Sequence, residues 1–176
     1  MRAFAAWVDN DRPNAGANFR GYAHGISQAR YVIRKVLRIV DEQAKKVGLD
    51  PLQHQALIQI YGNSDSPMPV NKVAERLDIA PAFASRLIKE LEGKGLIRRE
   101  SHPEDRRVTC VAATGAGVQL LRDIDDAVHV HVSYFQSQLS DDGRMAALAI
   151  FAFYVGLEGD SALAKAIRDS LHAPAA

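Results

Sequence analysis

Apolar residues recur at helical spacing along most of this chain, and the predicted elements follow from that spacing. Between residues 19 and 47 they fall on one stripe of a long amphipathic helix. A helix of this length suggests packing against a second chain. Gly48 ends it, and Asp50-Pro51 begins a second helix that runs to Tyr61. The stripe of the first helix contains Ile26, Ala29, Ile33, Val36, Leu37, Val40 and Val47.

The middle of the chain is predicted to form a helix-turn-helix followed by a two-stranded ribbon. A short helix over Val70–Leu77 precedes one that begins at Pro81. Strands are predicted over Leu96–Glu100 and Val108–Ala112, joined by a turn-rich segment. Such a helix suits the major groove of DNA, and such a ribbon reaches phosphates or the minor groove. In the helix from Pro81 the inward stripe is Ala84, Leu87, Ile88 and Leu91, and the outer face is Ala82, Ser85, Arg86, Lys89 and Gly93.

Helices are predicted again after the ribbon. Thr114 caps a long helix that runs to about Leu139, and two further helices are expected over Met145–Leu157 and Leu163–Leu171. The predicted fold is mainly α with a small β wing, a winged helix-turn-helix whose N- and C-terminal helices form a dimerisation region. The expected domains are a flexible arm over 1–18, a dimerisation helix over 19–50, a winged DNA-binding lobe over 51–115 and C-terminal dimerisation helices over 116–176.

Charge and composition narrow the function. The net charge is only +1, and between Val70 and Arg107 nine Lys and Arg residues face seven Asp and Glu. DNA affinity therefore depends on where the basic groups lie. The uncharged run Met145–Leu157 has 13 residues, too few to span a bilayer, and residues 1–8 lack a secretory apolar region. With its single cysteine, Cys110, the chain is expected to be cytoplasmic, without disulfide or membrane association.

Enzymatic, metal and cofactor functions find no support in the sequence. There is no nucleophile elbow, phosphate loop, HExxH motif or Gly-rich dinucleotide turn. His129 and His131 are two residues apart, so on a helix they cannot bind one metal ion together. His131 is instead expected to pack on the apolar stripe of its helix. We therefore expect no enzyme, no metal and no cofactor.

One long segment resembles the MarR family of bacterial transcription regulators. It is LDIAPAFASRLIKELEGKGLIRRESHPEDRRVTCVAATGAG, with the wing signature Asp105-Arg106-Arg107 and the helix opening Thr114-x-x-Gly117. The resemblance extends over residues 50–117 in sequence and over the whole chain in helix order. It implies a homodimer that binds a palindromic operator, usually as a repressor released by a small ligand. The chain departs from the family in having Pro81, Ala82, Phe83 and Ala84, without hydroxyls, at the start of its recognition helix.

The resemblance implies roles for the wing and the recognition helix. Arg107 would enter the minor groove, Asp105 would orient its guanidinium, and Arg106 would bind a phosphate. Ser85, Arg86 and Lys89 face outward on the helix and are predicted to contact bases or phosphates, and Ala82 can meet a thymine methyl. The alternative for Arg107 is a surface ion pair that contributes little to stability. Arg98 and Arg99 alternate on a strand, so at most one of them is expected to face DNA.

A second candidate site involves the first two helices. Arg30 and Arg34 lie one turn apart at the edge of the apolar stripe, and guanidinium groups beside an apolar cleft suit a carboxylate or phosphate on an organic body. His54 and Tyr61 share a face of the second helix with aliphatic residues. These four residues are predicted to bind an aromatic acid or its coenzyme A thioester. The alternative is a solvated basic face with dimer salt bridges and a core histidine.

The leading hypothesis is therefore a ligand-responsive transcriptional repressor, with a role in aromatic compound catabolism. Its partners would be double-stranded operator DNA, a second copy of the chain and a small organic anion. The competing hypothesis is a constitutive DNA-binding accessory or architectural protein without an effector. That protein would bind with a steep dependence on salt and little sequence preference.

Overall fold

The computed structural model describes residues 19–63, 67–102, 105, 107–141, 143–144, 147–148 and 151. The chain divides into two compact units, one made of residues 1–37 with 135–176 and the other of residues 38–134. The predicted arm over 1–18 and the predicted helix over 163–171 lie outside the described residues. Most of the predicted helix over 145–157 does so too.

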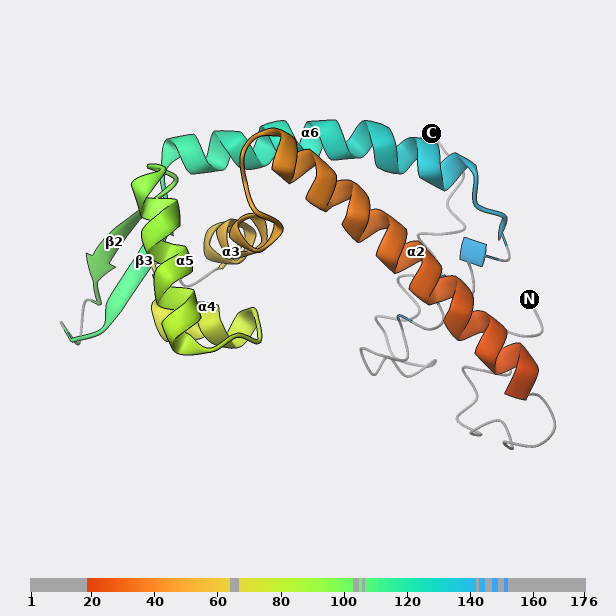
Figure 1. Cartoon of the computed structure of the whole chain (residues 1–176), viewed down its shortest axis with the longest axis horizontal. Helices are drawn as coiled ribbons and strands as arrows, with labels where there is room; N and C mark the ends of the chain where they lie inside the picture. The colour runs from red at the N-terminus through yellow and green to blue at the C-terminus, as the bar shows by residue number, and fades with distance from the viewer. Residues whose placement is uncertain are drawn as a thin grey trace, which may run out of the picture. The chain divides into compact units, whose positions relative to one another are not determined.

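The helices of the described chain follow the predicted order with small shifts at their ends (Figure 1). Asp50 caps the second helix, accepting from the backbone N–H of Leu52 at 2.9 Å, while Gln53 Oε1 accepts from the Asp50 N–H at 3.3 Å. Gly48 has φ +79°, which ends the first helix as predicted. The helices are α2 (Phe19–Lys46), α3 (Pro51–Tyr61), α4 (Val70–Arg76), α5 (Pro81–Gly93) and α6 (Gly115–Ser137).

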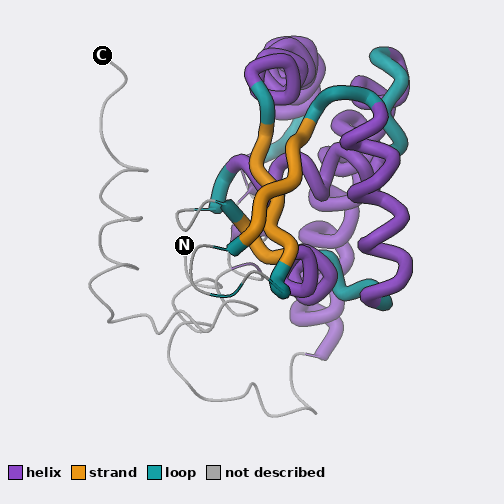
Figure 2. Tube along the Cα trace, turned by 90° about the vertical axis from the view of Figure 1, so that its left-hand side faces the viewer, coloured by secondary structure: helices purple, strands orange, loops and turns teal. Residues whose placement is uncertain are grey.

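The wing belongs to a sheet of three antiparallel strands in the order β1-β3-β2 (Figure 2). Strands β2 (Ile97–Ser101) and β3 (Thr109–Ala113) each lie one residue later than predicted. Strand β1 (Met68–Pro69) was not predicted, because two residues are too short to show an alternating pattern. Its Pro69 is compatible with a place at the sheet edge, where no ladder N–H is needed. In the register Met68 faces Val111, and Ile97 faces Ala113.

The core of the second unit lies where α3, α5, the sheet and the first half of α6 meet. Leu57, Ile88, Leu91 and Ile124 are almost completely buried in it. The helices α3, α4 and α5 lie together beside the strands (Figures 1 and 2). Burial of these apolar side chains holds α5 against the sheet, so the orientation of its outer face is set by the core.

The start of α6 is tied to the residues that precede β2. The Thr114 N–H donates to the Leu96 carbonyl at 3.0 Å, and the Thr114 hydroxyl donates to the Gly95 carbonyl at 2.7 Å. The Gly117 N–H donates to Thr114 Oγ1 at 3.1 Å, which confirms Thr114 as the helix cap. These bonds fix α6 to the lobe that carries the wing.

Further along α6 one expectation is wrong. His131 is exposed to solvent rather than packed on the apolar stripe. The helix continues beyond the last core contacts around Ile124 and Val128, so the stripe at this position has no cover within the second unit. In the first unit, the ring of Tyr31 meets that of Phe135 edge-on at 6.0 Å between centroids.

Candidate nucleic-acid interface

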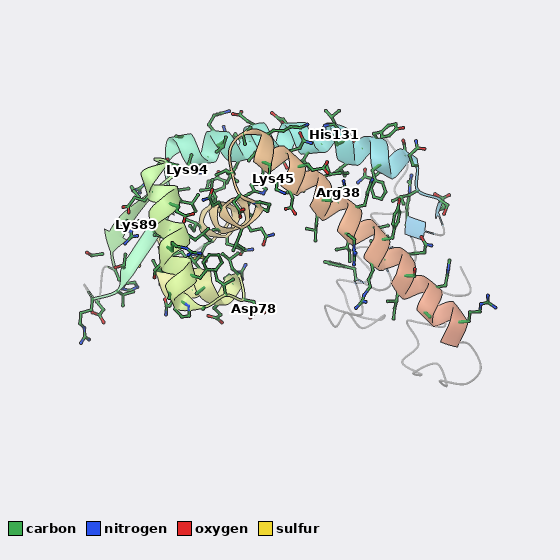
Figure 3. The ribbon with its side chains drawn as sticks, viewed as in Figure 1. Arg38, Lys45, Asp78, Lys89, Lys94 and His131 are labelled. Atoms are coloured by element: carbon green, nitrogen blue, oxygen red, sulfur yellow. The ribbon has the colours of Figure 1, made fainter. Side chains whose placement is uncertain are left out.

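The outer face of α5, defined here as Ala82, Ser85, Arg86 and Lys89, is exposed as predicted. Pro81 begins the helix, where its fixed φ and missing N–H cost nothing. Ala84, Leu87, Ile88 and Leu91 are buried on the opposite side. The 3.6-residue period therefore separates the core side from an outer face that carries two cations. Figure 3 shows Lys89 on this helix and Asp78 in the turn that precedes it.

Arg86 is held by two neighbours on its own helix. Its Cζ lies 4.7 Å from the centroid of the Phe83 ring, a cation–π contact at i,i+3 spacing. Its Nε lies 3.9 Å from Glu90 Oε1, at i,i+4 spacing. The Arg86 side chain is still 68% exposed. Arg86 therefore combines a restricted conformation with an accessible charge.

A polar network joins the recognition helix to the junction of α2 and α3. Buried Gln53 donates to Glu90 Oε2 at 2.9 Å and accepts from Lys94 Nζ at 2.7 Å. Lys94 Nζ also donates to the Gly48 carbonyl at 2.7 Å. The spacing of Asp50 and Gln53 is that of a capping box, which a local pattern can indicate. The contact of Gln53 with Glu90, 37 residues away, has no such local signal. Lys94 is thus engaged in structure, whereas Lys89 lies on the outer face.

In the wing, both carboxylate oxygens of Asp105 accept hydrogen bonds from the Arg107 guanidinium. Arg107 Nε lies 3.1 Å from Oδ1, Nη2 lies 3.3 Å from Oδ2, and the Arg107 backbone N–H donates to Oδ1 at 3.0 Å. The Arg107 side chain remains 93% exposed. The hydrogen bonds from the Arg107 side chain and backbone lower the pKa of Asp105, so its carboxylate stays ionised below the usual range. The contact expected between the two residues is present, while the groove contact of Arg107 stays a prediction.

The two arginines of β2, Arg98 and Arg99, each form an ion pair within the protein. Arg99 Nε pairs with Glu92 of α5 at 2.9 Å, and Arg98 Nε pairs with Glu100 at 2.6 Å. Each therefore has a carboxylate partner within the protein, and the expectation that at most one of them faces DNA stays a prediction. Arg106, predicted to bind a phosphate, lies outside the described residues.

A surface cleft of about 380 Å³ opens between α4, α5 and the strands. Its polar lining comes from Asn71, Ser85, Arg99 and Thr109. Ser85 thus faces this cleft as well as the outer side of α5. The rest of the lining is Val70, Pro81, Ile88 and Val108.

The four residues of the predicted effector site fall in different units. Arg30 and Arg34 are exposed residues of the first unit, and His54 and Tyr61 belong to the second. His54 is 3% exposed and its Nδ1 has no hydrogen-bond partner among the described residues, whereas Tyr61 is 53% exposed. Their joint binding of an organic anion stays a prediction. In the part of the chain that the structure describes, no cluster of three or more His, Cys, Asp or Glu side chains could hold a metal ion.

Burial of His54 leads to a prediction about pH. Loss of solvent lowers the pKa of His54, while the Asp41 carboxylate raises it by a smaller amount. As pH falls below the ordinary histidine value of about 6.5, the unfolded chain takes up the proton before the folded chain does. We expect the free energy of unfolding to decrease as pH falls through that range, and His54→Leu to lose this component. Urea unfolding of both proteins at several pH values tests it; equal slopes would contradict it.

Buried Cys110 is a poor candidate for redox chemistry. It lies on β3 and is fully buried. Desolvation raises the pKa of its thiol, with a further contribution from Glu100. The thiolate that such chemistry needs is therefore disfavoured.

Comparison with known protein families gives one matching model, that of the MarR family, over residues 47–108. This range contains α3, α4, α5 and the wing up to Val108. The helix-turn-helix region and the first strand of the wing therefore match the MarR family. No helix among the described residues is both long and apolar enough to cross a membrane.

Two relatives that match parts of this chain are transcriptional regulators by name. A protein of Thauera aromatica, named as a transcriptional regulatory protein for the hcr operon, is 33% identical over 50% of this chain and 52% of its own length. The match thus spans about half of that relative. The HTH-type transcriptional regulator MhqR of Bacillus subtilis is 28% identical over 58% of this chain and 70% of its own.

A solved structure supports the winged fold. The MepR–DNA complex of S. aureus superposes with a TM-score of 0.59 at 20% identity, over 72% of this chain and 93% of MepR. The predicted mainly α, winged helix-turn-helix fold is confirmed by this likeness and by the observed elements, while the dimerisation region stays a prediction.

Proposed function

We propose that this chain is a DNA-binding transcriptional regulator of the MarR family that acts in the cytoplasm. The observation that carries the proposal is the pairing, within one compact unit, of an exposed cationic helix face with an exposed arginine at a wing tip. Arg86 and Lys89 would enter the major groove, and Arg107 would reach the minor groove beside it. The names of the relatives, which are transcriptional regulators, point the same way.

We further propose a homodimer that binds a palindromic operator as a repressor. Large apolar side chains are exposed on α2 and α6, among them Tyr31, Leu37 and Val130. Covering such side chains with a second copy of the chain removes apolar surface from water and so stabilises a dimer. A two-fold dimer places two recognition helices in successive major grooves, about one helical turn of DNA apart.

Release of the operator would follow from binding a small organic anion, such as an aromatic acid or an aromatic acyl-CoA thioester. The exposed guanidinium groups of Arg30 and Arg34 supply the charge for such a ligand. For release, the ligand must bind more tightly to the protein conformation that does not fit the operator than to the conformation that does. The coupling free energy is typically 1 to 3 kcal/mol.

Selection of duplexes from a random library, followed by footprinting and titration, tests the regulator. We expect a palindromic site protected by two copies of the chain, and affinity that falls steeply with salt. Adding aromatic acids or their thioesters should then release the selected duplex and raise the melting temperature of the free protein.

The outcomes separate the parts of the proposal. Binding with no preferred sequence would identify an accessory protein instead of a regulator. A palindromic footprint that none of these anions weakens would contradict the effector while leaving DNA recognition in place. If Arg30 and Arg34 bind the anion, Arg30→Ala and Arg34→Ala should lose the release of DNA by the anion. Lys35→Ala, which removes another exposed cation of the same helix, is the matched control and should keep it.

A further inference from the structure

The recognition helix begins with Pro81, Ala82, Phe83 and Ala84, a segment that carries no hydrogen-bonding side chain. Phe83 is nevertheless 36% exposed at this end of the helix, at the border of the outer face of α5. The ring contacts the guanidinium of Arg86, whose Cζ lies 4.7 Å from the ring centroid.

We propose that Phe83 is a positioning residue that holds Arg86 flat and aims it at a guanine in each half of the operator. The inference rests on the proposed function and names one base and one residue pair within it. Arginine recognises guanine through two parallel hydrogen bonds to O6 and N7, which require a guanidinium of defined plane and direction. An exposed arginine without support samples many rotamers and loses side-chain entropy on binding.

Two contacts restrain the guanidinium. Its Cζ lies over the Phe83 ring, 4.7 Å from the ring centroid. Glu90 faces the Nε edge, at 3.9 Å from its Oε1. Within the described residues no acceptor is hydrogen-bonded to the terminal Nη atoms of Arg86, so the edge that would read guanine remains available.

Glu90 is itself fixed from the core side. Its Oε2 accepts a hydrogen bond from buried Gln53 at 2.9 Å, and Gln53 is held by Lys94 at 2.7 Å. The support of Arg86 thus runs from the interior of the lobe to its outer face. A cation–π contact suits this task better than a second ion pair, because the ring leaves every N–H donor of the guanidinium unused.

The test uses the full-length protein and the duplex obtained by selection, with each guanine replaced in turn by 7-deazaguanine, which lacks the N7 acceptor. At one guanine in each half-site, this replacement should lower the affinity of the wild-type protein for the duplex by about 5- to 140-fold. Arg86→Ala should be insensitive to that replacement. Phe83→Leu should reduce the discrimination about two- to fivefold, and Phe83→Tyr, which keeps the ring, should restore it.

Controls separate positioning from other roles. Lys89→Ala is expected to weaken binding to all duplexes alike and to reduce the salt dependence. If Phe83→Leu keeps its effect in the Arg86→Ala background, Phe83 contacts DNA directly and the positioning role is overturned. A circular dichroism melt confirms that each variant is folded.

Two results distinguish this inference from the function on which it rests. A selected palindrome whose guanines can all be replaced without loss would overturn the assignment of Arg86 and Phe83 and leave the regulator intact. Failure of the wild-type protein to prefer any duplex would overturn both.

Discussion

Replacing Gly117 by alanine is expected to destabilise the protein by about 3 kcal/mol. A Cβ atom at this position would lie 2.1 Å from the Leu96 carbonyl oxygen and 3.3 Å from a methyl group of fully buried Leu57. The carbonyl cannot move aside easily, because it accepts the Thr114 N–H at 3.0 Å where α6 begins. The clash would therefore separate α6 from the strand that leads into the wing. Urea unfolding at fixed protein concentration measures the effect.

Gly115→Ala provides the matched control. Gly115 lies two residues earlier in the same helix, and nothing lies within 4 Å of a Cβ built there. Because alanine restricts the unfolded chain more than glycine does, this variant should be neutral or more stable by up to about 1 kcal/mol. If Gly117→Ala unfolds at the same urea concentration as Gly115→Ala, the close approach of α6 to Leu96 is not a constraint on the fold.

Replacing Arg107 by alanine is expected to weaken operator binding by on the order of 1 to 3 kcal/mol, with little change in stability. The side chain is almost completely exposed, and its ion pair with Asp105 joins residues two apart in one turn, so its loss removes little from the fold. The bidentate contact orders the guanidinium before DNA arrives, which lowers the entropic cost of insertion into the minor groove. Gel-shift titration at fixed salt gives the change in affinity.

Arg122→Ala is the control for Arg107→Ala. Arg122 is an exposed arginine on α6, away from the wing and the recognition helix in the sequence, and its removal changes net charge equally. Affinity lost in equal measure by both variants would show a non-specific charge effect. Unchanged binding by Arg107→Ala would mean that Arg107 serves only its surface ion pair.

The order of helices and strands was predictable because each depends on local signals. The stripe Ala84, Leu87, Ile88 and Leu91 specified which side of α5 is buried, and Asp50-Pro51 and Thr114 marked helix starts through their own hydrogen bonds. The two-residue strand β1 escaped prediction, since it exists only through pairing with β3. The prediction that His131 is packed was wrong, because periodicity indicates on which face of a helix a residue lies but not how far along the helix other elements cover that face.

By itself the sequence determined the winged helix and the cations that its recognition helix and wing carry, since periodicity and the Asp105-x-Arg107 spacing act over a few residues. Only the tertiary structure decided which of those cations are available. Arg99 is held by Glu92 of α5 and Lys94 by the Gly48 carbonyl, whereas the side chain of Arg86 stays largely exposed. It also placed the Leu96 carbonyl, 21 positions earlier in the chain, against the site where a side chain at Gly117 would begin. Contacts between residues far apart in the chain arise from packing of the folded lobe, and no local pattern encodes them.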